Sequence, residues 1–258
     1  MKNYIVIALF IVAGAIGLRS CSGCSSGDKG KETDTIPTFV KADTTEVLRL
    51  TQEYLEYVKN KEYDKAVAMY QKALEQKIDN NEKRAGVIKQ LSDCYLAKED
   101  YSNAIKYYQD YLTTLGNASA NDAAALAQIY IQYADTLSDT ARIDMFKKAE
   151  QVYVDMEKKY PDALEYVTFM RARVNSYMDP ETKEGLAKPY YEKVMGMIEP
   201  RAEKSASDNA RLVECYRYLG YYYLLKEDKA TSTSYWNKIL AIDPENEIAK
   251  QALTLTTK

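Results

Sequence analysis

The sequence predicts an all-α fold built as a stack of helix pairs, and three observations predict it. Beyond about Thr44, glycine and proline almost vanish from the interiors of segments. Apolar residues recur there at steps of three and four with charged residues between them, which is the period of an amphipathic helix. A short pattern, a small residue followed four positions later by an aromatic one, recurs along the chain and indicates an internal repeat.

Composition excludes several classes of function. The chain has 258 residues, a net charge of −3 and no histidine. A nucleic-acid partner requires a strongly basic face, which a slightly acidic chain does not favour. Catalysis by Ser-His-Asp or Cys-His groups and His-ligated metal sites are excluded, because histidine is absent. We therefore expect no enzyme activity and no cofactor. Cys94 and Cys215 lie in apolar helical patterns and are predicted to be buried.

The N-terminus predicts export. MKN is followed by 15 apolar, uncharged residues at 4–18. A spanning helix needs about 20 such residues, so a secretory signal fits this segment better. The sequence Leu18-Arg19-Ser20-Cys21 comes directly after it.

These last residues resemble the lipobox of bacterial lipoproteins. The resemblance implies a cleaved leader at 1–20 and a diacylglyceryl group on Cys21, with further acylation (palmitate-type chains) of the new amino terminus. Ser22 after the lipidated cysteine implies the outer membrane more than the inner one, and a domain facing the periplasm. Three alternatives stay open: a retained apolar anchor, soluble export, and a thiol pair of Cys21 and Cys24 that would make the protein a thiol-disulfide enzyme.

Residues 21–43 are predicted to be a flexible linker, because they are small, polar and interrupted by a proline. The helical repeat domain is predicted to follow at 44–258. Its second helices carry the recurrent pattern, in which large rings fill the space beside small residues that allow close helix approach. The five pairs are Ala66/Tyr70, Ala104/Tyr108, Ala149/Tyr153, Ala187/Tyr191 and Ser232/Trp236.

The intervals between the five aromatic residues are 38, 45, 38 and 45 residues. The longer intervals predict either inserted helical turns or longer loops. The acidic pairs Glu99/Asp100 and Glu227/Asp228 fall between predicted helices, where we expect their charges to be simply exposed.

The repeated residues resemble the tetratricopeptide repeat, a 34-residue helix-turn-helix unit. The last unit carries the fullest pattern, with Tyr216, Leu219, Gly220 and Tyr223 in its first helix and Trp236, Ile239, Leu240 and Pro244 in its second. The resemblance implies a right-handed superhelical solenoid of about five units. A final helix at about 245–256, with exposed Lys, Glu, Gln and Thr, is predicted to form a polar cap on the stack.

Proteins of that family bind other proteins through a concave face lined by first helices, so the resemblance implies a protein or peptide partner. The matching positions are Lys89, Gln90 and Asp93 in the second unit, Gln128 and Gln132 in the third, Arg173 and Ser176 in the fourth, and Arg217, Tyr218 and Tyr221 in the fifth. The sequence predicts a non-catalytic adaptor tethered to the cell envelope. An alternative is a subunit of the outer-membrane β-barrel assembly machinery, whose helical lipoprotein has the same architecture.

Overall fold

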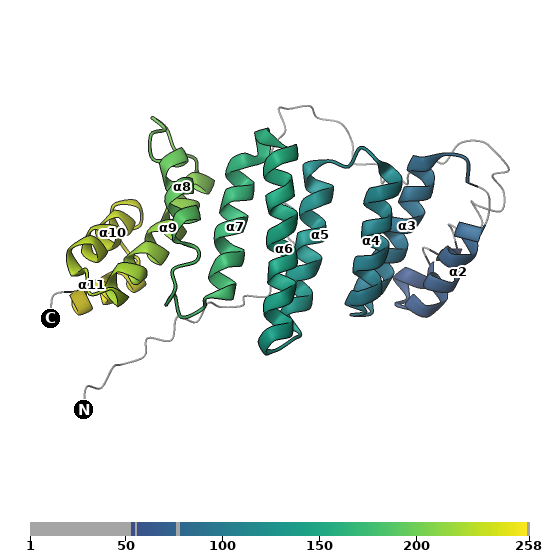
Figure 1. Cartoon of the computed structure of the whole chain (residues 1–258), viewed down its shortest axis with the longest axis horizontal. Helices are drawn as coiled ribbons and strands as arrows, with labels where there is room; N and C mark the ends of the chain where they lie inside the picture. The colour runs from purple at the N-terminus through teal and green to yellow at the C-terminus, as the bar shows by residue number, and fades with distance from the viewer. Residues whose placement is uncertain (1–52, 55, 76–77, 257–258) are drawn as a thin grey trace. The chain divides into compact units, whose positions relative to one another are not determined.

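The computed structural model describes residues 53–54, 56–75 and 78–256, and every regular element among them is helical (Figure 1). The predicted leader, Cys21, Cys24 and the linker lie outside these residues. Residues 53–54 and 56–59 are helical. The helices that follow are α2 (Tyr63–Glu75), α3 (Asn81–Ala97), α4 (Tyr101–Leu115), α5 (Ala120–Asp135), α6 (Asp139–Lys159), α7 (Leu164–Met178), α8 (Lys188–Ile198), α9 (Ala206–Leu225), α10 (Lys229–Ile242) and α11 (Glu247–Thr256).

Each helix packs chiefly on the helices that precede and follow it in the sequence, which makes a solenoid of five helix pairs and a final helix (Figure 1). The even-numbered helices α2 to α10 are the second helices of the pairs. The predicted third first-helix, at about 122–137, is α5, shifted by two residues. The predicted all-α solenoid is confirmed.

The small and large residues of the repeat lie where they were predicted. The small member of each pair is fully buried, at 0% exposure. The aromatic members are buried as well: Tyr70, Tyr108, Tyr153, Tyr191 and Trp236. Because the helices cross at the small residues, the rings beside them fill the space between the two backbones.

Two crossings are fixed by the same hydrogen bond made in opposite directions. In the second pair Ser92 Oγ, on the first helix, donates to the carbonyl oxygen of Ala104 at 2.7 Å. In the fifth pair the serine is on the second helix, and Ser232 Oγ donates to the carbonyl oxygen of Gly220 at 2.7 Å. A hydroxyl reaches the opposite backbone only where the helices nearly touch, so these bonds mark the closest approach in each pair.

The two long intervals have different causes. In α2, α4 and α10 the aromatic residue is the eighth residue of the helix, whereas Tyr153 is the fifteenth residue of α6. The additional seven residues are close to two turns at 3.6 residues per turn, so they leave the buried face of α6 unrotated. In the second long interval the additional residues are divided among the end of α8, the connection 199–205 and α9, which has 20 residues against 17 in α3. Inserted turns therefore explain the first long interval, and longer helices together with a longer connection explain the second.

The acidic pairs in the turns have a structural role that the sequence prediction missed. Glu99 and Glu227 adopt left-handed backbone conformations, with φ of 60° and 62°. Asp100 then caps α4 by accepting from the amide of Asn103, and Asp228 caps α10 by accepting from the amide of Thr231. Asp228 is exposed, as predicted, and Asp100 is half-buried, but each aspartate also satisfies an otherwise unpaired amide at a helix start.

Helix α7 joins two hydrophobic cores. Val167, Met170 and Val174 pack into the core that begins at Tyr54, while Phe169 and Ala172 pack into the core that continues to α11. The buried face of α7 is therefore broad, as expected for a helix with neighbours on both sides.

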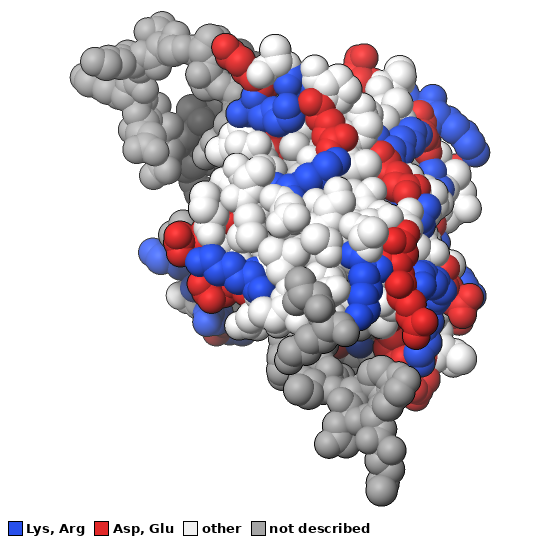
Figure 2. All heavy atoms as spheres, turned by 90° about the vertical axis from the view of Figure 1, so that its left-hand side faces the viewer, with Lys and Arg blue, Asp and Glu red and all other residues white. Residues whose placement is uncertain are grey.

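The C-terminal helix is less polar on its outer side than predicted. Ala249 and Ala252 of α11 are buried, but Ile248 remains 48% exposed. Leu225, at the end of α9, is also exposed. Figure 2 looks onto this end of the stack and shows an uncharged surface bordered by charged side chains. The exposed Glu247, Gln251 and Thr254 agree with the predicted polar cap, and Ile248 is the apolar exception.

The Asp122 carboxyl, at the start of α5, is predicted to make the stability of the fold depend on pH. Asp122 completes a capping box with Ser119 and accepts from the Tyr111 hydroxyl at 2.7 Å. Burial alone would raise the pKa of Asp122, but the hydrogen bonds from Ser119 and Tyr111 outweigh it and lower the pKa below 3.8. We expect Asp122→Ala to lower the free energy of unfolding by about 1–2 kcal/mol at pH 7.

The sign of the pH effect follows from the lowered pKa. A carboxyl whose folded pKa lies below its unfolded value stabilises the fold above the unfolded pKa, and this contribution is lost as the pH falls through the folded pKa. Urea denaturation at pH 7 and pH 2.5 should therefore show a smaller difference between wild type and Asp122→Ala at the lower pH. Asp110→Ala, at an exposed position of α4, is the matched control. An equal loss from both variants would contradict the prediction.

Candidate partner-binding surface

The ten residues predicted to face a partner lie on the first helices α3, α5, α7 and α9. The structure brings several of them together in two clusters. An N-terminal cluster surrounds Lys89 and Asp93, and a C-terminal cluster surrounds Arg173 and Tyr218. Gln90 and Gln132, on α3 and α5, belong to neither.

In the N-terminal cluster, tyrosine rings surround two opposite charges. The Lys89 amine lies 5.9 Å from the centroid of the Tyr111 ring, a cation–π distance. Asp93 keeps an exposed side chain, yet partial removal of water from its carboxylate raises its pKa, which Lys89 opposes. Burial raises the pKa of the nearby Tyr54 to about 12, and the Asp93 charge adds to the rise. The charged groups of Lys89 and Asp93 therefore lie at the surface beside the tyrosine rings.

In the C-terminal cluster, Arg173 is already occupied. Its Nε and Nη2 donate to the two carboxylate oxygens of Glu214 at 2.8 and 2.6 Å. The hydroxyl of Tyr191 also donates to Glu214, at 3.0 Å. The Glu214 hydrogen bond raises the pKa of Arg173 above its usual range. This ion pair connects α7 to α9, so Arg173 stabilises the stack and offers little to a partner.

Two further predicted residues are committed to the fold. Gln128 Nε2 donates to the Tyr153 hydroxyl at 2.9 Å, which ties α5 to α6. Ser176 is buried, and its hydroxyl donates to the Arg173 carbonyl oxygen one turn earlier at 2.7 Å. The Ser176 hydroxyl proton is therefore used within its own helix, and burial keeps the oxygen away from a partner.

Three predicted residues keep free polar groups. Gln90, Gln132 and Arg217 have no hydrogen bond or ion pair with any other residue in the described part of the chain. Gln132 is exposed, while Gln90 and Arg217 are half-buried. Among the described residues Arg217 has no carboxylate partner, and Glu214, one turn before it, pairs with Arg173.

The two tyrosines beside Arg217 differ in their surroundings. The Tyr218 ring packs against Tyr191 with ring centroids 4.8 Å apart, and burial raises the pKa of its hydroxyl well above the usual value. Tyr221 is half-buried, and burial followed by the charge of Glu181 raises its pKa. Arg217 and Tyr221, four positions apart on α9, therefore present a cation and a ring on neighbouring turns of one helix.

The sequence did not identify three residues that surround the predicted partner-binding residues: Glu214, Tyr111 and Asp122. Glu214 lies three residues before Arg217, so a carboxylate on the same face of α9 could have been found from the i, i+3 spacing. No sequence signal places Tyr111 beside Lys89, because this contact depends on how α4 crosses α3.

Chemistry of other kinds has little support in the residues that the structure describes. Cys94 and Cys215 are buried and free, as predicted, and burial raises the pKa of the Cys94 thiol to about 11. A thiol that holds its proton so strongly is a poor nucleophile. Within residues 53–256, where described, no cluster of metal-ligating side chains occurs and no helix could cross a membrane.

Comparison with known proteins gives structural likenesses alone. No protein-family model matches the chain, and no curated protein matches it. The C-terminal part of a TPR repeat-containing protein from Cytophaga hutchinsonii is 22% identical over 78% of this chain and 98% of that one, with a TM-score of 0.39. A TPR protein from Thermus thermophilus is 13% identical over 81% of this chain and 98% of that one, with a TM-score of 0.42.

A tetratricopeptide repeat protein from Parabacteroides merdae is 16% identical over 84% of this chain and 86% of that one, with a TM-score of 0.33. All three structures are described as tetratricopeptide repeat proteins, the repeat to which the sequence pattern was compared above.

Proposed function

We propose that this protein is a non-catalytic interaction scaffold that binds a protein or peptide partner along its first helices. One observation carries the proposal. Some polar side chains on that surface form hydrogen bonds within the described part of the chain, and others do not. Arg173, Gln128 and Ser176 already make side-chain hydrogen bonds within the chain, whereas Gln90, Gln132 and Arg217 make none with the described residues. The guanidinium of Arg217, which has no partner among the described residues, can donate directional hydrogen bonds to a partner's carboxylate or carbonyl oxygen.

The C-terminal first helix is the strongest part of this surface. Arg and Tyr are the residue types that most often dominate binding energy at interfaces. Arg217 supplies directional donors, and Tyr221 supplies a rigid ring on the next turn. The Arg173–Glu214 ion pair beneath them fixes α9 against α7, so the binding groups are presented by a rigid backbone.

Crosslinking in cells tests the proposal. A photo-crosslinking residue at position 132 should capture a partner, and Arg217→Ala with Tyr221→Ala should reduce that capture by about tenfold or more. The matched control places the crosslinker at Asn237, an exposed position on the second helix α10. Capture from position 237 that equals capture from position 132, or capture unaffected by the double substitution, would contradict binding along the first helices.

The second part of the proposal is attachment to the cell envelope through a lipid on Cys21, with the helical domain facing the periplasm. Support comes from the apolar N-terminal run and the Leu18–Cys21 pattern. Three acyl chains hold a protein firmly in a bilayer, whereas one chain holds it only marginally. Acyl labelling should be lost in Cys21→Ser and kept in Cys24→Ser. If both thiols of the mature protein react with a maleimide, lipidation is wrong and the thiol-pair alternative gains support.

A further inference from the structure

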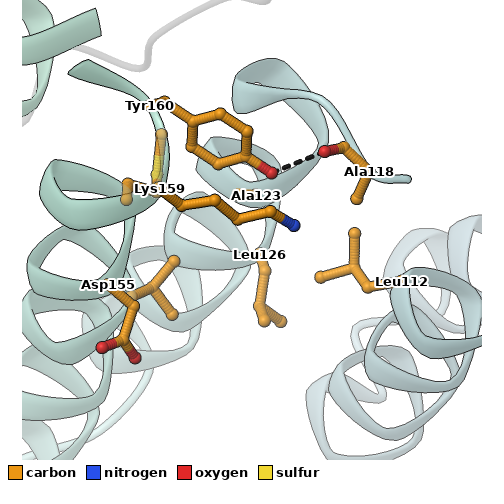
Figure 3. A pocket seen from close by; sticks show the side chains of 9 residues that line it. Leu112, Ala118, Ala123, Leu126, Asp155, Lys159 and Tyr160 are labelled. Atoms are coloured by element: carbon orange, nitrogen blue, oxygen red, sulfur yellow. Dashed lines mark hydrogen bonds between the residues drawn. The ribbon is translucent and has the colours of Figure 1, made fainter. Parts of the chain in front are cut away.

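A pocket of about 230 Å³ lies away from the predicted partner surface, where α4 and α6 end and α5 begins. Five aliphatic or thioether side chains form its walls: Leu112, Ala123, Leu126, Val152 and Met156. Ala118, Asp155, Lys159 and Tyr160 complete the lining (Figure 3). An apolar hollow of this kind is suited to a ligand with a hydrocarbon body.

The polar groups at the pocket are mostly occupied. The Tyr160 hydroxyl donates to the Ala118 carbonyl oxygen at 2.5 Å. Asp155 accepts from Gln151 at 3.1 Å and lies 3.7 Å from the Lys158 amine. In Figure 3 the Asp155 carboxylate is turned away from the hollow. The Tyr160 hydroxyl proton is therefore used within the fold, and the Asp155 charge is partly balanced by Lys158.

Lys159 is the exception. Figure 3 shows its side chain lying across the mouth of the pocket, with the amine on the side of Leu112 and Ala118. Its only contact with the described residues is a cation–π approach to the Tyr160 ring, at 5.2 Å from the centroid. Among those residues no carboxylate pairs with it. The pocket thus combines apolar walls with one unpaired positive charge at its rim.

We propose that this pocket binds a medium-chain fatty acid, with the hydrocarbon against the apolar walls and the carboxylate on Lys159. A cavity of about 150 Å³ holds a benzene molecule. A pocket of about 230 Å³ therefore accommodates a chain of roughly six to eight carbon atoms. Charge complementarity selects a carboxylate over an amine or an alcohol, and the flexible stem of Lys159 lets the amine follow the head group.

Titration with octanoate tests the assignment. In the full chain with ¹³C-methyl methionine, the Met156 signal, identified by its absence in Met156→Leu, should shift with saturation below about 10 mM octanoate. Lys159→Gln should weaken octanoate binding about three- to fivefold, as expected for a partly exposed ion pair. Octanol binding should not change in this variant, since octanol carries no charge.

Lys147→Gln is the matched control, because Lys147 is an exposed lysine of the same helix whose charge partner, Asp144, lies outside the pocket lining. Equal weakening by the two substitutions would overturn the proposal, as would equal affinity for octanoate and octylammonium, or no saturable shift of Met156. If the dipeptide acetyl-Leu-Glu-amide displaces octanoate at lower concentration than octanoate itself binds, the pocket belongs to a polypeptide and the fatty-acid assignment is wrong. Crosslinking from position 132 is independent of all these outcomes.

Discussion

Trp236→Ala is expected to lower the free energy of unfolding of the C-terminal helix pair by about 3–5 kcal/mol. The indole is 2% exposed, and a Cβ on Gly220 would lie 2.8 Å from its ring. Truncation to alanine leaves a cavity between α9 and α10 that two rigid helices cannot close. It also removes the indole N–H that donates to Ser232 Oγ at 3.0 Å.

The consequence should be local because the stack is built from neighbouring contacts. In a solenoid each unit is stabilised mainly by the units next to it, so loss at one end frays that end first. Hydrogen exchange should accelerate in α9, α10 and α11 and change little in α3 to α5. Trp236→Phe, which keeps a ring against Gly220, should lose less than half as much. Uniform acceleration along the chain would contradict the nearest-neighbour stack.

The close crossings could be predicted from sequence because they need small residues, although the serine hydrogen bonds that fix two of them were not predicted. The pairs Ala104/Tyr108 and Gly220/Trp236 fit only a close crossing, in which the small residue lets the helices approach and the ring fills the space beside it. The spacing of Tyr153 could not distinguish inserted turns from a longer loop, since both keep the same interval. The structure resolves this for α6, where helical turns were added at its N-terminal end.

The candidate site was less predictable than the fold. Position in the repeat identified which residues lie on first helices, but not which of them have partners. Arg173 and Arg217 are indistinguishable on that criterion, yet Glu214 pairs with Arg173 and leaves Arg217 free. Which arginine pairs depends on the separation of α7 and α9, and that separation is set by the connection 199–205 and the packing around Tyr191. These are contacts between units, which the pattern within one unit does not contain.

Tyr153→Ala is expected to lower the free energy of unfolding by about 3–5 kcal/mol, and here the effect should reach the whole stack. Tyr153 is fully buried in α6, near the middle of the array. Its removal weakens the third pair against the neighbours on both sides, including α7, the helix shared by the two cores. Chemical denaturation should then show a lower midpoint, or two transitions if the halves unfold separately.

Tyr153→Phe separates packing from hydrogen bonding. The ring stays in place, but Gln128 Nε2 loses the hydroxyl that accepts from it at 2.9 Å. We expect a loss of about 1–2 kcal/mol, because the hydrogen bond between this hydroxyl and Tyr166 is also lost. If Gln128 instead served a partner, Tyr153→Phe would free its amide and strengthen capture from position 132 without destabilising the chain. A stability loss with unchanged capture would show that Gln128 acts within the fold and that the partner depends on Arg217 and Tyr221.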